Sequence, residues 1–263
     1  MNFAVAVLAS GSKGNATFIN ACGKKFLVDI GLCVSDLQER LFQIGEHIEN
    51  LDAVFITHEH NDHIKGLEVF AKNFSVPIYT SKNTWREIVK VFPNICRKNC
   101  NLFCGEKIFD NVKVVNFCTS HDAADPHGYS IFADAKKLTY VTDTGFVSET
   151  IKNNIDNSDV LIIESNHDIK MLTEGDYPPF LKKRILSTQG HLANSTVANV
   201  LVNLEKLPEI IFLAHLSQHN NTEELALETI KKELAKAGKN PKILAARQNE
   251  IVASFEIGGK LCK

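Results

Sequence analysis

Short apolar runs rich in valine and isoleucine alternate along this chain with longer amphipathic segments. Short apolar runs bounded by polar residues are typical of buried β-strands, and apolar positions at helical spacing, such as Leu225, Ile230 and Leu234, predict helices. The expected strands are Phe3–Leu8, Lys25–Asp29, Ala53–Thr57, Val76–Tyr79, Val112–Phe117, Tyr129–Ala133, Leu138–Thr142, Val160–Glu164, Ile210–His215 and Lys242–Ala245. The expected helices include Val34–Ile44, Asp62–Lys72, Asn83–Val91, Phe180–Leu186, Ser195–Leu204 and Glu223–Lys236.

The order of these elements favours an α/β protein with mixed sheets. The early strands are typical of hairpins, whereas the later ones are separated by helices. No low-complexity linker, charge block or short repeat divides the sequence. We therefore expect residues 1–263 to form a single domain, with two sheets packed face to face and helices outside.

Composition narrows the possible partners without naming one. With 44% hydrophobic and 23% charged residues, the chain is ordinary for a globular protein, and its formal net charge of −2 gives no general attraction for a polyanion. A nucleic-acid partner would have to be held by a local basic patch or by bound metal ions. No apolar run approaches the roughly 20 residues that span a bilayer, and the apolar start is too short for a signal peptide. We expect a soluble, cytoplasmic protein without a membrane partner.

The 7 cysteines are scattered, and their odd number argues against a secreted disulfide framework. Cys96, Cys100 and Cys104 recur at a spacing of four, which raises the alternative of a structural metal site. Such sites need four ligands and commonly a glycine-rich turn, and this segment offers neither. Reduced thiols are the favoured interpretation.

The closest grouping of potential metal ligands lies directly after the strand expected at Ala53–Thr57. Three imidazoles and a carboxylate follow within six residues, as His58, His60, Asp62 and His63. Two histidines one residue apart can serve one ion, while the next two side chains, at a helix start, can turn toward a second ion. Imidazole with carboxylate suits zinc, manganese or iron. The cluster therefore predicts metal binding.

This motif resembles that of the metallo-β-lactamase superfamily, whose pattern is His-x-His-x-Asp-His after a hydrophobic strand. The resemblance continues with His121, Asp143 and His215, each at an expected strand end. It implies an αββα four-layer sandwich and two divalent ions per chain. One ion would lie on His58, His60 and His121. The other would lie on Asp62, His63 and His215, with Asp143 shared.

Further segments resemble the YycJ (WalJ)-type branch of that superfamily, a group of proposed DNA exonucleases. The Gly- and Ser-rich opening offers Ser10, Ser12 and Asn15 as phosphate contacts, although a plain hairpin turn is an equal alternative. Ala193 departs from that pattern, which more often has serine. Basic side chains and a late histidine complete the expected substrate-binding set, namely Lys182, Lys183, Arg184 and His219.

The resemblance implies hydrolysis of a phosphodiester, by a 5′ exonuclease acting on DNA, through a hydroxide that bridges the two ions. His191 is expected to assist the leaving oxygen, and Asp62 to orient the nucleophile. His167 is a weaker candidate, and His47 and His127 are interpreted as structural. Zinc, manganese or iron would fit. A homodimer and a role in DNA repair are expected by analogy only.

Two other functions stay open at this point. One is a small-molecule hydrolase, either a cyclic-nucleotide phosphodiesterase or a thioester hydrolase. The other is a non-catalytic or redox use of the fold with iron, which normally needs a flavin domain that this sequence does not contain.

Overall fold

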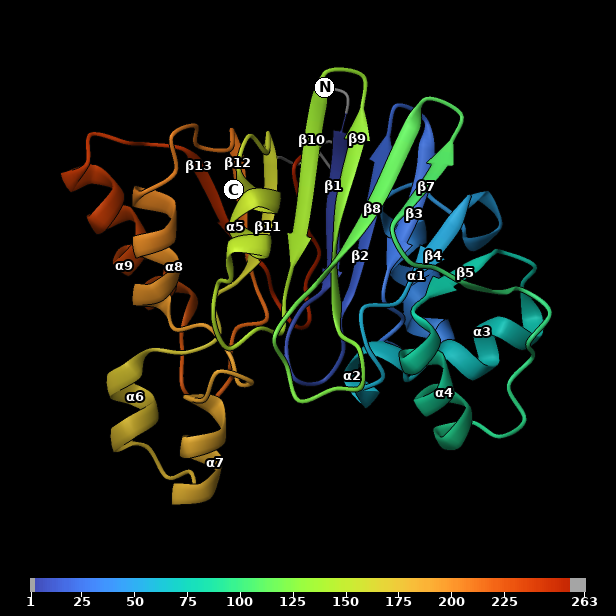
Figure 1. Cartoon of the computed structure of the whole chain (residues 1–263), viewed down its shortest axis with the longest axis horizontal. Helices are drawn as coiled ribbons and strands as arrows, with labels where there is room; N and C mark the ends of the chain where they lie inside the picture. Colours follow the sequence, from blue (N-terminus) through green and yellow to red (C-terminus); the bar gives the residue numbers. More distant parts are fainter. Residues whose placement is uncertain (1–2, 256–263) are drawn as a thin grey trace.

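The computed structural model describes residues 3–255, and within them the chain forms two sheets that stack face to face (Figure 1). The first sheet has the strand order β14 (Val252–Ala253), β1 (Phe3–Ala9), β2 (Ala16–Ala21), β3 (Lys24–Val28), β4 (Ala53–Phe55), β5 (Ile78–Thr80) and β6 (Cys100–Leu102). The second has the order β13 (Lys242–Ala245), β12 (Ile210–Ala214), β11 (Val160–Glu164), β10 (Lys136–Val141), β9 (His127–Ala133), β8 (Val112–Cys118) and β7 (Glu106–Phe109).

The core between the sheets is aromatic and aliphatic and takes side chains from both. Phe55 of the first sheet lies 5.2 Å from Tyr129 of the second, measured between ring centroids, and it also contacts Tyr79 and Phe103. The Tyr129 hydroxyl donates to the backbone oxygen of Ile56 at 2.6 Å. This contact joins the two sheets immediately beside the expected metal ligands.

Helices cover the outer face of each sheet, so the layers are α, β, β, α as expected (Figure 1). The first sheet is covered by α1 (Val34–Gln43), α3 (Leu67–Asn73) and α4 (Lys82–Val91). The second is covered by α5 (Glu149–Ile155), α8 (Asn194–Val202) and α9 (Glu223–Lys236). The remaining helices are η1 (Ile48–Asn50), α2 (Asn61–Ile64), α6 (Ile169–Glu174) and α7 (Pro179–Ile185), of which α6 and α7 extend past the sheets (Figure 1).

The single helix expected over Asp62–Lys72 is wrong, because the structure divides it into α2 and α3. Gly66 separates them and donates its N–H to the backbone oxygen of Ile30 at 2.9 Å. A Cβ at this glycine would lie 2.2 Å from the backbone oxygen of Leu32, so this close approach requires glycine. The break fixes where the metal-ligand loop meets the first sheet.

The prediction also missed several short elements, namely β2, β6, β7, β14, α5 and α6. β7 is mostly exposed at a sheet edge, so its apolar pattern is weak. The two helices are short and begin at side-chain caps, where Ser148 accepts from the Ile151 N–H and Asp168 from the Met171 N–H. Within residues 3–255, each helix is too short or too polar to cross a membrane.

Candidate metal centre

Ligand-type side chains gather where the carboxyl ends of strands from both sheets meet. β3 and β4 run parallel, as do β10, β11 and β12. β8 shares the direction of β10 because both are antiparallel to β9. The residues that end or follow these strands therefore emerge at one end of the sandwich: Asp29, His58, His60, His121, Asp143, Glu164 and His215.

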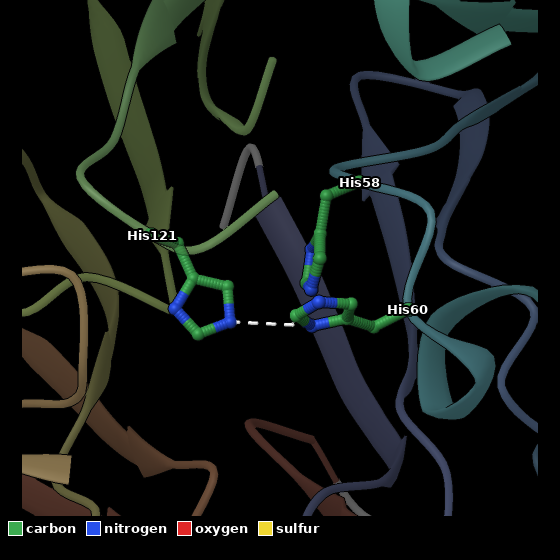
Figure 2. A group of neighbouring side chains, drawn as sticks. All are labelled: His58, His60 and His121. Atoms are coloured by element: carbon green, nitrogen blue, oxygen red, sulfur yellow. Dashed lines mark hydrogen bonds between the residues drawn. The ribbon is translucent and has the colours of Figure 1, made fainter. Parts of the chain in front are cut away.

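The first group of ligands consists of three imidazoles (Figure 2). His58 and His60 come from the loop after β4, and His121 comes from the segment after β8. Nε2 of His121 lies 3.3 Å from Nδ1 of His60, and the ligand atoms of all three residues lie within 4.8 Å of one another. The trio expected for the first ion is therefore brought together.

The second group joins Asp62 and His63 of α2 to His215 after β12. Oδ2 of Asp62 lies 3.5 Å from Nε2 of His63 and 3.4 Å from Nε2 of His215. Asp143 lies between the two groups, with Oδ2 3.3 Å from Nε2 of His63 and Oδ1 3.8 Å from Nε2 of His121. Asp143 therefore lies where a ligand shared by the two groups would have to lie.

These side chains fit divalent ions because several of their buried nitrogen and oxygen atoms lie close together but form no hydrogen bond with one another. Among residues 3–255, Nε2 of His58 and Oδ2 of Asp143 are buried without a hydrogen-bond partner. Nδ1 of His121 is positioned to donate to the backbone oxygens of Gln189 and Gly190, at 3.1 and 3.2 Å, which leaves Nε2 with its lone pair. Buried polar atoms without partners are costly, and a cation would satisfy all of them at once.

The buried carboxylate of Asp29 positions two ligands of the first sheet, His63 and His58, through hydrogen bonds on the side of each ring away from the ion. Its Oδ2 accepts from Nδ1 of His63 at 2.7 Å, and its Oδ1 accepts from the Thr57 N–H at 2.8 Å. The Thr57 hydroxyl donates to the same carboxylate and lies 3.0 Å from Nδ1 of His58. Partners of this kind fix the tautomer of a metal-binding histidine and aim its other nitrogen at the ion.

Glu164 positions histidines of the second sheet in the same way. This fully buried carboxylate ends β11, and its Oε1 accepts from Nδ1 of His191 at 2.7 Å and from Nδ1 of His215 at 2.9 Å. Its Oε2 accepts from the N–H groups of Thr144 and Leu192. Both imidazoles therefore present Nε2 away from Glu164, and His191 lines the cavity beside the centre.

The pKa values of the ligand side chains are shifted in different directions by burial and by neighbouring charges. The pKa of Asp143 is lowered, because the attraction of His215 and His63 outweighs the opposing effect of burial. The same balance holds the pKa of Asp62 well below its ordinary value. Burial and neighbouring imidazoles hold the pKa of His58 well below its ordinary value, so this ring stays neutral. The pKa values of His63 and His215 are instead raised well above the ordinary value, because the neighbouring carboxylates outweigh the opposing effect of burial. Bound cations would replace the protons of these two rings, since ionised carboxylates and neutral imidazoles are the forms that bind metal.

Three site residues adopt left-handed backbone conformations that only glycine adopts without strain. Asp29, Asp143 and His215 have φ angles of 64°, 54° and 55°. Asp29 and His215 directly follow β3 and β12, and Asp143 follows β10 after one intervening residue. Such strained residues persist where the surrounding structure over-determines them, and they cluster at functional sites.

The opening segment contributes structure to this centre. The side chains of Ser10 and Asn15 are buried. Ser10 accepts from the His215 N–H at 2.7 Å, and Nδ2 of Asn15 donates to Oδ2 of Asp62 at 3.1 Å. Gly31 donates its N–H to the backbone oxygen of Asn15, and a Cβ there would lie 1.8 Å from the backbone oxygen of Asp62. Two of the three predicted phosphate contacts thus already bind the ligand loops.

A cavity of about 160 Å³ opens beside the centre, lined by His121, His191 and His215. Ser12 and Arg184, two of the predicted substrate contacts, line it as well. Arg184 pairs through Nε with Asp122 at 2.5 Å. Tyr177 lines the same cavity.

The other predicted substrate contacts lie outside the lining of this cavity. Nζ of Lys182 donates to the backbone oxygen of Thr173 at 2.8 Å, and Lys183 is exposed on α7. The His219 ring contacts the Tyr177 ring in a tilted arrangement, with 5.7 Å between ring centroids. The structure therefore brings Ser12 and Arg184 to the centre and leaves these three residues at its margin.

Two positioning residues were missed by sequence reasoning, although each left a signal. Asp29 follows a buried strand and precedes Gly31, a pattern that predicts a turn with a fixed carboxylate. Glu164 is a charged residue at the end of the wholly apolar run Val160–Ile163. A buried charge must be paired, so both positions indicated partners elsewhere in the chain.

Comparison with known proteins agrees with this geometry. The Metallo-beta-lactamase superfamily matches residues 9–191. The exodeoxyribonuclease YycJ of Bacillus anthracis is 39% identical over 242 residues, which cover 90% of this chain and 91% of YycJ. The exodeoxyribonuclease WalJ of Streptococcus pneumoniae is 38% identical, with 90% of each chain covered.

Solved structures show the same fold at low identity. The metallo-β-lactamase fold protein YhfI from Bacillus subtilis has a TM-score of 0.70 and 17% identity, covering 96% of this chain and 99% of YhfI. The short form of human tRNase Z has a TM-score of 0.63 and 16% identity, covering 97% and 100%. This chain belongs to the metallo-β-lactamase superfamily, in the family of YycJ and WalJ, and is a metal-dependent hydrolase.

Proposed function

We propose that this chain is a two-metal exonuclease that removes nucleotides from the 5′ end of DNA. The observation that carries the proposal is the pair of ligand groups joined at Asp143, with His191 and Arg184 on the adjoining cavity. The exodeoxyribonuclease names of YycJ and WalJ support DNA as the substrate. The groups that would hold the ions are His58, His60 and His121 for one, and Asp62, His63 and His215 for the other, with Asp143 between them.

Two divalent ions of the zinc or manganese type supply Lewis acidity toward phosphate oxygens and lower the pKa of the attacking water. Asp62 is the carboxylate best placed to orient that water, because its Oδ2 faces both His63 and His215 and its side chain is partly exposed. Asn15 holds this carboxylate through a hydrogen bond of 3.1 Å.

His191 serves the leaving group. Its Nδ1–H donates to Glu164, so Nε2 is the nitrogen that can carry a proton toward the cavity. The attacking water gives one proton to solvent and its oxygen forms a bond to phosphorus. The bond from phosphorus to the leaving oxygen breaks, and the Nε2 proton of His191 passes to that oxygen. The charge of Glu164 stabilises the protonated imidazole before transfer.

Positive charge for the DNA backbone comes from the ions and from a few local side chains, because the chain as a whole carries −2. Arg184 and Ser12 both line the cavity. Lys183, one residue before Arg184 on α7, is exposed beside them. A strand of DNA entering here would meet these side chains before its terminal phosphodiester reached the metal centre.

The test is a nuclease assay on protein stripped of metal and resupplied with Mn²⁺ or Zn²⁺. Single- and double-stranded DNA labelled at the 5′ or 3′ end would be the substrates. We expect metal-dependent release of nucleotides from the 5′ end, with no release by Asp143→Ala, which should also bind less metal. Release from the 3′ end would overturn the polarity. Cleavage of small phosphodiesters with no release from DNA would move the function to a small-molecule phosphodiesterase.

The matched variant is His191→Ala. It should keep its metal content and lose about 10²- to 10⁴-fold in kcat, the usual contribution of general acid–base catalysis. Wild-type turnover in a fully metallated His191→Ala protein would remove this residue from the mechanism.

A further inference from the structure

A separate group of ligand-type side chains lies at the base of the loop that carries His121. Cys118 ends β8 and His127 begins β9, and these two are cross-strand partners that close the loop. Asp125 lies in the loop between them. One ligand atom from each of the three lies within 4.8 Å of the other two. The sequence reasoning did not connect these residues, and none of them belongs to the metal centre described above.

The separations approach those of a tetrahedral site. Sγ of Cys118 lies 3.8 Å from Nε2 of His127, and Oδ1 of Asp125 lies 3.9 Å from the same nitrogen. Bond lengths of about 2.3 Å for zinc–sulfur and about 2.0–2.1 Å for zinc–nitrogen place tetrahedral ligand atoms about 3.3–3.6 Å apart. Cys118 is exposed and Asp125 is half-buried, so both side chains can close the remaining few tenths of an ångström.

The histidine of this group is already fixed in a ligand's orientation. His127 is buried, and its Nδ1 lies 2.9 Å from the backbone oxygen of Asp125, to which it donates. Its backbone N–H donates to the oxygen of Thr57 at 3.1 Å. The ring therefore carries its lone pair on Nε2, the nitrogen that faces Cys118. Metal-binding histidines commonly donate their second N–H to a backbone carbonyl in this way.

We propose that Cys118, Asp125 and His127 bind a further divalent cation of the zinc type, with water as the fourth ligand. Sulfur with imidazole selects zinc over the hard cations magnesium and calcium. Binding exchanges the thiol proton for the ion, and the proton goes to solvent. Partial desolvation and the charge of Asp125 raise the pKa of the Cys118 thiol, so loss of its proton to solvent, and with it this exchange, becomes more favourable as the pH rises.

The position of the site gives it a structural consequence. An ion there would tie the end of β8 to the start of β9 and to the loop between them. That loop carries His121 and Asp122, and the Thr57 oxygen that His127 holds is next to His58. The ion would therefore restrain two ligands of the catalytic centre without touching the substrate.

Cobalt(II) added to the full-length, metal-stripped protein tests the proposal, because only a thiolate ligand gives the near-ultraviolet sulfur-to-cobalt charge-transfer band. The catalytic centre offers imidazoles and carboxylates alone. We expect the band in the wild type and its persistence in His58→Ala, which damages the catalytic centre. It should vanish in Cys118→Ser and require about tenfold more cobalt in His127→Gln.

Cys104→Ser is the matched control, since it removes another exposed thiol near the same strand end. This variant should keep the full band. Absence of the band in the wild type, or its survival in Cys118→Ser, would overturn the site. Loss of the band in Cys104→Ser would overturn the ligand set.

Discussion

The two sheets supply the metal centre in different ways. The first sheet delivers four predicted ligands from one loop and the start of α2, all within residues 58–63. The second delivers His121, Asp143 and His215 from the ends of three separate strands. The first set is fixed mainly by local chain geometry. The second set comes together only when β8, β10 and β12 are aligned in one sheet. The positions of these three ligands relative to one another therefore depend on how the sheet packs.

The supporting carboxylates differ in the same direction. Asp29 binds one imidazole directly and reaches a second through Thr57. Glu164 binds two imidazoles directly, one from a predicted ligand and one from the predicted proton donor. The comparison suggests that losing Glu164 damages both metal binding and proton transfer, whereas losing Asp29 damages metal binding alone.

Of the two supporting carboxylates, Glu164 should show the larger effect when it is changed to Gln. The carboxylate accepts four hydrogen bonds, two on each oxygen. In the amide, the oxygen can keep only one of these pairs, and the NH₂ group then faces the N–H donors of the other pair. We expect kcat to fall about 10³-fold, from combined loss of metal orientation and proton transfer. Steady-state kinetics at saturating metal would measure it. If excess metal brought kcat of the variant back to the wild-type value, Glu164 would act in metal binding only.

Asp29→Asn should have a smaller and simpler effect. One amide oxygen can still accept from Thr57, but the NH₂ group opposes the Nδ1–H of His63. We expect metal affinity to fall about 10- to 100-fold, with kcat recovering when metal is in excess. Titration of metal against activity would show it. If kcat stayed low at saturating metal, the contrast between the two carboxylates would fail.

His167 offers a comparison based on stability. It lies on the second sheet's side, is buried, and neither ring nitrogen has a partner among residues 3–255. Burial lowers its pKa to about 4. Because the unfolded chain takes up a proton near pH 6.5 and the folded chain does not, stability is lost as the pH falls between these values.

The expected loss from this residue is about 2 kcal/mol between pH 8 and pH 5. Urea unfolding of metal-stripped wild type and His167→Gln at both pH values would isolate it, since all other groups are common to the two proteins. An unchanged difference in the free energy of unfolding would show that His167 does not remain neutral in the fold.

The smallest effect is expected from Arg184→Ala, in the cavity beside the metal centre. This residue pairs with Asp122 and lines the cavity, so we expect weaker DNA binding with kcat retained. Loss of one phosphate contact should reduce the slope of log KM against log salt concentration by about 1. Lys182→Ala is the control, because its ammonium is bound to the Thr173 carbonyl. Equal salt dependence in both variants would remove Arg184 from the substrate path.

Much of the fold could be predicted, because Val- and Ile-rich runs and helical spacing are local signals. The layer architecture and long elements such as α9 agree with expectation. The division of α2 from α3 could not be predicted, since it depends on how closely Gly66 approaches Leu32. Edge strands such as β7 are also weak in sequence, because their side chains face solvent and lose the apolar alternation.

The sequence by itself was enough for the family and the candidate ligands, because its strand-ending His and Asp motifs resemble those of the metallo-β-lactamase superfamily. It did not reveal which side chains support them. Asp29 meets His63 across 34 residues, and Glu164 meets His215 across 51. These atoms meet only when β3 pairs with β4 and β11 pairs with β12. The same holds for Ser10 and Asn15, which read as phosphate contacts along the chain but lie buried against the ligand loops once β1 and β2 are paired.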